Sequence, residues 1–135
     1  MILVDSSVLI DLIEDHPHWR RWSEGALVRA SNTDALAINV LVYAEISRSF
    51  ASAAKVDAFL HSTGIAVEAI PAAAAFAAAR AHQVYRDTGG ARTATLPDFF
   101  IGAHAAEAGW TLLTRDAKRM RTYFPALQLI VPAPA

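Results

Sequence analysis

Short apolar runs alternate along the chain with longer stretches whose apolar residues recur at helical spacing. The apolar runs predict strands at residues 2–4, 36–38, 66–70, 110–114 and 127–131. Continuous rather than alternating hydrophobicity is typical of parallel strands that are covered on both faces. We therefore expect one α/β domain over residues 1–135, with three α/β/α layers around a parallel sheet of four to five strands.

Helices are predicted between these strands. Ser6 or Ser7 is a natural N-cap for a helix that follows the first strand, and Pro17 separates that helix from a second amphipathic stretch. Pro71 suits the first turn of a long alanine-rich helix that runs to about Thr88 and ends at two glycines. The other predicted helices include residues 42–46, 56–60, 97–108 and 117–123.

The composition narrows the class of protein. The 135 residues are 54% hydrophobic and 19% charged, and the chain has no cysteine. Disorder, a disulfide framework and a thiolate metal site are therefore excluded, so any metal must be held by oxygen or imidazole. The longest apolar run, residues 71–79, is far shorter than the roughly 20 residues of a membrane span. The first residues lack the basic region of a signal peptide, so we expect a cytoplasmic protein without a membrane partner.

Charge is distributed unevenly although the net charge is only −1. Residues 1–79 hold five basic and nine acidic side chains, whereas residues 80–135 hold seven basic and four acidic ones. The densest basic cluster consists of Arg115, Lys118, Arg119 and Arg121. A local basic face can contact a phosphate backbone even when the whole protein is not basic. A solvated helix face is the alternative explanation of the same cluster.

Four acidic residues lie where a parallel sheet places its ligands. Asp5 directly follows the first predicted strand and Asp116 follows the fourth, while Asp98 begins the helix before that fourth strand. Glu45 interrupts the apolar run of residues 40–46, where a charge that faces the core is costly unless it is paired. Because ligands bind beyond the carboxyl ends of parallel strands, we expect the four acids to converge at one sheet edge.

Each acid also has a purely structural explanation. Asp5 and Asp116 can serve as N-caps of the helices that follow them. Asp98 suits the positive end of a helix dipole, and Glu45 can lie on a solvent-facing side of its helix. The residue types and their positions leave both explanations open for each acid.

Four segments together resemble a known family. They are residues 4–10 (VDSSVLI), 42–46 (VYAEI), 96–105 (LPDFFIGAHA) and 112–116 (LLTRD). The set resembles the PIN-domain ribonucleases and, within them, the VapC-type toxins of bacterial toxin–antitoxin pairs. The resemblance covers nearly the whole chain and includes all four acids in the expected order. It implies a five-stranded parallel sheet between helices, and divalent-metal cleavage of single-stranded RNA or of exposed loops in structured RNA.

The resemblance also implies roles for the acids. It assigns the catalytic cluster to Asp5, Glu45, Asp98 and Asp116. We expect Asp5 and Asp98 to bind the metal directly and Asp116 to hold it partly through water. Glu45 positions or deprotonates the attacking water, or helps to hold a second metal ion. Oxygen ligands completed by water suit Mg²⁺, and Mn²⁺ as well, whereas zinc prefers histidine or cysteine.

Neighbouring residues receive supporting roles. By the same resemblance, Ser6 and Thr114 form hydrogen bonds with metal-bound water. Arg92 and Arg115 lie close enough in sequence to the acids to contact an RNA phosphate, although surface arginines are often only solvated. The family resemblance further implies a cognate antitoxin, which buries an apolar segment in a groove of the early helices, and a homodimer.

The expected function is thus a Mg²⁺-dependent endoribonuclease that acts as the toxin of a type II toxin–antitoxin pair. A housekeeping PIN nuclease of RNA processing would use the same acids. A non-catalytic PIN-like module that binds RNA or an antitoxin is a further alternative, although such modules normally lack one or more of the acids. A receiver-like signalling domain fits poorly, because it needs an acid after the third strand and a lysine after the last.

Overall fold

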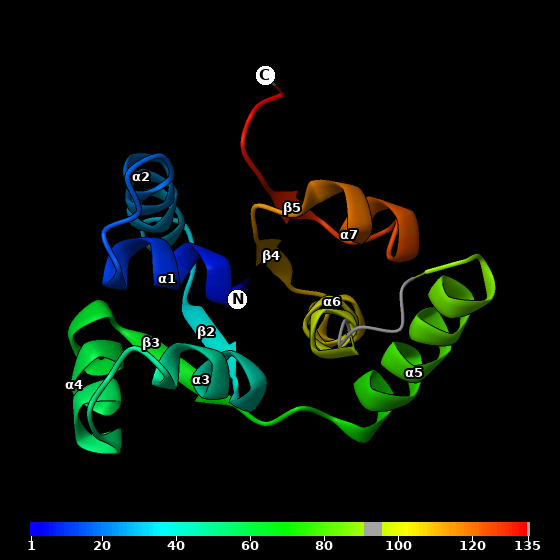
Figure 1. Ribbon diagram of the computed structural model, residues 1–135, viewed down its shortest axis with the longest axis horizontal. Helices are drawn as coiled ribbons and strands as arrows, with labels where there is room; N and C mark the ends of the chain where they lie inside the picture. The colour runs from blue at the N-terminus through cyan, green and yellow to red at the C-terminus, as the bar shows by residue number, and fades with distance from the viewer. Residues whose placement is uncertain (91–95, 135) are drawn as a thin grey trace.

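A single sheet forms the centre of the computed structural model, which describes residues 1–90 and 96–134 (Figure 1). Within these residues the sheet contains five parallel strands. In spatial order they are β3 (Ile65–Glu68), β2 (Leu36–Asn39), β1 (Ile2–Val4), β4 (Thr111–Leu113) and β5 (Leu129–Ile130). The predicted parallel sheet is therefore confirmed, with β1 at its centre.

The order of the strands reverses at β1, which is the position where open parallel sheets bind their ligands. From β1 the chain proceeds outward to β2 and β3 on one side, and later to β4 and β5 on the other. Val4 pairs in register with Leu113, so Asp5 and Thr114 follow neighbouring strands at the same edge. Ligands of open parallel sheets bind at such a switch point, because the connecting helices diverge there.

Seven helices are described in these residues, and they lie on both sides of the sheet (Figure 1). They are α1 (Ser6–Ile13), α2 (Arg20–Ser31), α3 (Val40–Ser47), α4 (Ala53–Thr63), α5 (Ala72–Asp87), α6 (Leu96–Ala108) and α7 (Ala117–Tyr123). The α5 helix packs along α6, and α1 packs against both α2 and α3. The predicted α/β/α arrangement is confirmed. Among the described helices, none combines the length and the apolar character that crossing a bilayer requires.

The apolar runs of the central strands form the core of the protein. All three residues of β1 are buried, as are Leu112 and Leu113 of β4. The prediction that both faces of the sheet are covered is wrong for β3, where Ala66 is exposed and Val67 is 45% exposed. The strand lies at an edge of the sheet, where fewer helices can pack over it. It also starts and ends earlier than the predicted residues 66–70.

The helix boundaries agree closely with the sequence signals. The α5 helix begins directly after Pro71 and ends at Asp87, and Gly89 follows with a φ of 90°. A positive φ is accessible to glycine without steric cost, so the glycine pair ends this helix as predicted. Trp19 and Trp22 are only partly buried and meet edge to face, with their ring centroids 6.1 Å apart. They cover the rim of the core rather than its centre.

Candidate active site

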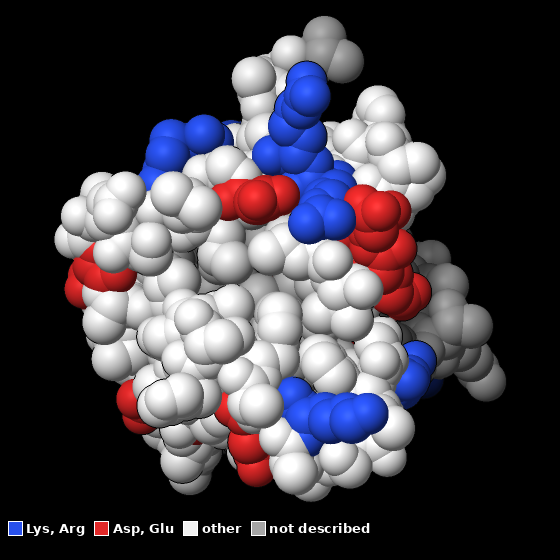
Figure 2. Space-filling model, turned by 90° about the vertical axis from the view of Figure 1, so that its left-hand side faces the viewer, with Lys and Arg blue, Asp and Glu red and all other residues white. Residues whose placement is uncertain are grey.

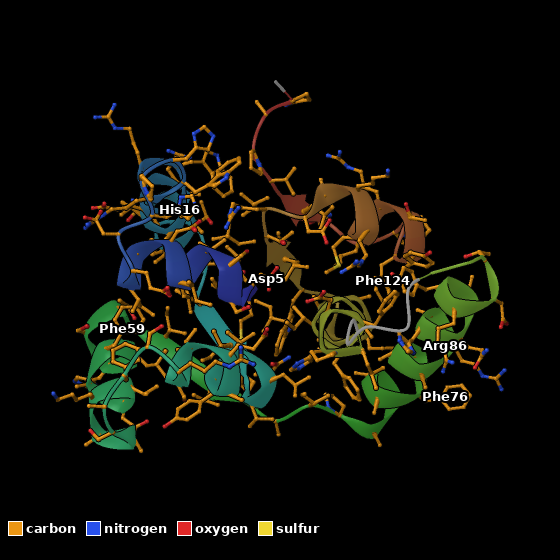
Figure 3. All side chains as sticks on the ribbon, in the orientation of Figure 1. Asp5, His16, Phe59, Phe76, Arg86 and Phe124 are labelled. Atoms are coloured by element: carbon orange, nitrogen blue, oxygen red, sulfur yellow. The ribbon has the colours of Figure 1, made fainter. Side chains whose placement is uncertain are left out.

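Asp5 is held at the switch point between β1 and α1. It occupies the N-cap position of α1 with an extended backbone, but its side chain makes no capping hydrogen bond. Its Oδ2 instead accepts a hydrogen bond from the Thr114 hydroxyl at 2.7 Å, and the Ser6 hydroxyl lies 3.5 Å from Oδ1. Figure 3 shows Asp5 near the middle of the fold, between α1 and α6. Its carboxylate is therefore bonded to the residue that follows β4 and does not serve as a helix cap.

Burial and neighbouring acids shift the protonation of Asp5. The side chain is 8% exposed, and this burial raises the pKa of Asp5 to about 6. The hydrogen bond from Thr114 opposes the shift, whereas the carboxylates of Asp98 and Glu45 add to it. Like charges disfavour one another's ionised forms only when they lie close together. The structure thus brings three of the four predicted acids into one electrostatic cluster.

Glu45 faces this cluster from α3. The Asn39 side chain accepts hydrogen bonds at 3.1 Å from the backbone N–H groups of Leu41 and Val42, so α3 begins directly after β2. Glu45 is half-buried, and its Oε1 atom is buried without a hydrogen-bond partner among the described residues. Burial raises the pKa of Glu45, the Ser6 hydroxyl lowers it and Asp98 raises it. The alternative of a solvent-facing acid does not describe this side chain.

Asp98 and Asp116 meet at Arg119, a member of the basic cluster whose contact with the acids was not predicted. Arg119 places Nη1 2.6 Å from Asp98 Oδ2 and 3.7 Å from Asp116 Oδ2. Asp116 Oδ1 also accepts the backbone N–H of Arg119 at 3.3 Å, so Asp116 caps α7 as well as facing the acids. Burial raises the pKa of Asp98, and Arg119 counteracts this effect. The signal for Arg119 was its position three residues after Asp116, which places both side chains on one side of a helical turn.

Arg115 is directed toward α1. Its Nη2 donates a hydrogen bond to Asp11 Oδ1 at 3.0 Å, and its guanidinium lies over the ring of Trp19 at 4.9 Å. The prediction that Arg115 contacts RNA stays a prediction. The other predicted RNA contact, Arg92, lies outside the described residues. Sequence reasoning also missed Asp11 as the partner of Arg115. The position of this acid between the buried Val8 and the partly buried Leu12 was a signal that it would be buried and paired.

The donor chemistry of the cluster fits a hard divalent cation. All four predicted acids supply oxygen donors, and the unpartnered Oε1 of Glu45 is the kind of buried atom that a cation stabilises. As the side chains stand, no three carboxylate or imidazole groups within residues 1–90 and 96–134 are close enough to enclose an ion. Arg119 is the cation that contacts Asp98 in this arrangement. We therefore conclude that the residues suit Mg²⁺ or Mn²⁺ by donor type.

Comparison with known proteins identifies a family for this arrangement. A family model described as the PIN domain matches residues 2–124, which include all four acids. No curated protein matches the chain significantly. The matched residues cover every strand except β5, so the family assignment and the observed sheet refer to the same part of the chain.

Solved structures share the fold along their whole length. VapBC2 from Rickettsia felis, bound to a DNA fragment from its promoter, contains a chain that is 20% identical with a TM-score of 0.72, covering 98% of this chain and 100% of that one. A toxin–antitoxin complex from Klebsiella pneumoniae gives 23% identity and a TM-score of 0.70, covering both chains completely. VapBC-1 from nontypeable Haemophilus influenzae contains a chain that is 17% identical with a TM-score of 0.72, covering 97% of this chain and 98% of that one. These likenesses show the fold.

Proposed function

Because the chain belongs to the PIN-domain family, we propose that it is a Mg²⁺-dependent endoribonuclease and the toxin of a type II toxin–antitoxin pair. The observation that carries this proposal is the coupling of Asp5 to Asp98 and Glu45 at the switch point of the sheet, with the pKa of Asp5 raised to about 6. Strongly shifted carboxylates in a crevice are typical of catalytic and metal sites. We expect Mn²⁺ to support the same activity.

Each acid has a distinct task in the proposed hydrolysis. Asp5, Asp98 and Asp116 would hold the divalent ion, which supplies a lowered water pKa and neutralises charge on the phosphate. Glu45 accepts the proton of the attacking water at its unpartnered Oε1, because its raised pKa suits a general base. Water adds to phosphorus, the P–O bond to the leaving ribose oxygen breaks, and that oxygen takes a proton from the solvent to leave as a hydroxyl. Thr114 and Ser6 keep the Asp5 carboxylate oriented throughout.

An apolar groove on the surface supports the proposal of a protein partner. The groove measures about 250 Å³ and lies between α1, α2 and α4, where Leu12, Leu27 and Val28 form much of its lining. Figure 2 shows that uncharged side chains cover the centre of this side of the molecule, with charged ones mainly toward its margins. The solved chains of similar fold come from toxin–antitoxin complexes. We assign the groove to the apolar segment of a cognate antitoxin.

A homodimer in the cytoplasm is the form that we propose for the free toxin. Phe76 is 63% exposed on the outer side of α5, and Val84 is also exposed on that helix. Exposed large apolar side chains on one helix favour burial against another protein surface. A second copy of the chain can cover them. The cytoplasm contains the RNA that the enzyme would cleave.

The nuclease proposal is tested by incubating total RNA with the purified protein. We expect discrete fragments with Mg²⁺ or Mn²⁺, and none with EDTA. Asp5→Asn removes the fragments, whereas the matched control Asp57→Asn on the exposed side of α4 retains them. Unchanged cleavage by Asp5→Asn would overturn the metal assignment. Absence of cleavage by the folded wild-type protein would instead favour a non-catalytic module that binds RNA or an antitoxin.

The toxin proposal needs a separate experiment in cells. Expression of the chain alone is expected to inhibit growth, and co-expression of the neighbouring open reading frame is expected to relieve the inhibition. Asp5→Asn should not inhibit growth at the same protein level. Inhibition that the neighbouring gene does not relieve would argue against the toxin role and for a housekeeping PIN nuclease, which would use the same acids.

A further inference from the structure

A second cavity adjoins the acid cluster on the side of α5 and α7. It measures about 340 Å³, and its lining residues are Tyr85, Asp116, Lys118, Arg119, Thr122 and Tyr123. Asp116 is one of the four predicted acids, and Arg119 pairs with both Asp98 and Asp116. The cavity therefore borders the proposed cleavage site. Its volume falls within the range of about 300–1,000 Å³ that is typical of small-molecule sites.

Two tyrosine rings form the aromatic part of this cavity. Tyr85 comes from α5 and Tyr123 from the end of α7, and their ring centroids lie 5.9 Å apart at an angle of 75°. Each ring packs on the buried Phe99, at centroid distances of 5.5 Å and 5.1 Å. His82 stacks on Tyr85 as well. These contacts hold the rings in place, and a partly buried aromatic surface of this kind is suited to stacking with a nucleobase.

Two cations complete the lining. Lys118 is exposed, and the Arg119 guanidinium carbon lies 5.6 Å from the centroid of Tyr85. Arg119 contacts Asp98 and Asp116 through Nη1. A guanidinium carries five N–H donors, so one edge can pair with a carboxylate while another donates a hydrogen bond to a phosphate oxygen. Aromatic rings beside two cations match the base and the phosphate of one nucleotide.

We propose that this cavity binds a single RNA nucleotide next to the cleaved bond, with its base against Tyr85 and Tyr123 and its phosphate at Lys118 and Arg119. This inference rests on the proposed ribonuclease function. It assigns substrate contacts to α5 and α7, and it selects Lys118 and Arg119 from the basic cluster that the sequence indicated as a face for a phosphate backbone. It also gives Arg119 a task in the RNA complex beyond its pairing with Asp98.

The experiment measures RNA binding without cleavage. A fluorescein-labelled single-stranded RNA of mixed sequence is titrated with the protein in EDTA, at several salt concentrations, and its anisotropy is followed. We expect Tyr123→Leu to weaken binding about 5- to 50-fold, because base–aromatic stacking is lost. Lys118→Gln should reduce the slope of log affinity against log salt by about 0.7, the effect of one phosphate contact on a single strand. Adenosine 5′-monophosphate at millimolar concentration should compete with the RNA.

Matched controls separate this proposal from the enzyme's function. Lys55→Gln on α4 removes an exposed lysine away from the cavity and should leave affinity and salt slope unchanged. Lys118→Gln changes an exposed residue, so it keeps the test valid if Tyr123→Leu fails to fold. If the wild-type protein cleaves RNA but Tyr123→Leu and Lys118→Gln both bind RNA as tightly as it does, the cavity proposal alone is overturned. Failure of the wild-type protein to bind or cleave any RNA would overturn both proposals. Loss of antitoxin binding in these variants, with RNA binding intact, would assign the cavity to the protein partner instead.

Discussion

Thr114 donates a hydrogen bond from its hydroxyl to Asp5 at 2.7 Å, although the two residues lie 109 positions apart. The same oxygen accepts the backbone N–H of Asp116 at 3.0 Å. One buried hydroxyl thus orients the first acid and shapes the turn that carries the last. The contact with Asp5 depends on the pairing of β1 with β4, which aligns the ends of the two strands, whereas the contact with Asp116 is local to the turn.

Replacing Thr114 by valine should shift the acid limb of the cleavage profile. The hydrogen bond lowers the pKa of Asp5, so its loss raises that pKa above its present value of about 6. A hydrogen bond to a charged group contributes about 1.5 kcal/mol, which corresponds to about one pH unit. Single-turnover cleavage measured from pH 5 to pH 9 should show the shift, and Thr114→Ser should restore the original limb. An unshifted limb in Thr114→Val would contradict the assigned contact.

Asp5→Asn should stabilise the folded protein at neutral pH. The pKa of Asp5 is 3.8 in an unperturbed chain and about 6 in the fold, so the unfolded state releases its proton first as pH rises. The unfolding free energy of the wild type therefore falls as the pH rises from about 4 to about 6. The difference of about two units corresponds to roughly 3 kcal/mol, and a gain of about 1–3 kcal/mol is expected for the variant.

Urea unfolding at pH 4 and pH 7 checks this expectation. The gain in unfolding free energy from Asp5→Asn should be largest at pH 7 and should shrink toward pH 4. At pH 4 residue 5 is uncharged in the folded wild type as well as in the folded variant. Asp57→Asn provides the comparison at an exposed acid. A variant that is less stable than wild type at pH 7 would show that the Asp5 carboxylate stabilises the fold without metal.

Divalent metal should make the wild-type protein more stable than Asp5→Asn, the reverse of their order without metal. An ion that binds only the folded state stabilises it by about 2.7 kcal/mol at a concentration 100 times its Kd. We expect Mn²⁺ to raise the Tm of the wild type and of Asp57→Asn, and to leave the Tm of Asp5→Asn nearly unchanged. Differential scanning fluorimetry across a Mn²⁺ series measures the shifts. Equal shifts in all three proteins would place the ion away from Asp5.

The ion pair between the buried Asp11 and the partly exposed Arg115 should be important for stability. Asp11 is 1% exposed, accepts a hydrogen bond from the Ser23 hydroxyl at 2.6 Å and pairs with Arg115 at 3.0 Å. Arg115→Gln leaves a buried carboxylate without its cation, and we expect a loss of about 2–4 kcal/mol. The control Arg20→Gln breaks exposed pairs and should cost less than about 1 kcal/mol.

A double-mutant cycle isolates this pair from other effects. Asp11→Asn with Arg115→Gln should be clearly less destabilised than the sum of the single variants, because the charge and its partner are removed together. Strict additivity in urea unfolding would show that the two groups do not interact.

Gly102 should not tolerate a side chain. A Cβ at this position would lie 2.6 Å from Phe124 Cε2 and 2.8 Å from Met120 Sδ, because α7 packs closely on α6 here. Overpacking of a core costs about 1–3 kcal/mol, so Gly102→Ala should lower stability by that amount. Gly25→Ala is the control, because its Cβ would meet only the end of the Arg29 side chain, at 3.0 Å. Thermal unfolding of both variants makes the comparison. A Gly102→Ala protein as stable as Gly25→Ala would contradict the packing.

The sequence by itself determined the alternation of strands and helices and the identity of the acids. Apolar runs such as residues 2–4 and 36–38 could be recognised as strands, because a continuous apolar run is stabilised when it leaves water. The acids Asp5 and Asp116 were visible because each directly follows such a run. Local caps such as Asp116 could also be predicted from spacing, since the cap and its helix are adjacent.

Only the tertiary structure decided which distant side chains meet. It placed Arg119 on Asp98, directed Arg115 to Asp11, and left Val67 exposed on an edge strand. These outcomes depend on the order of strands in the sheet, and that order is set by long-range packing that no local pattern encodes. The site therefore combines residues that the sequence could identify with contacts that exist only because β1 and β4 are neighbours.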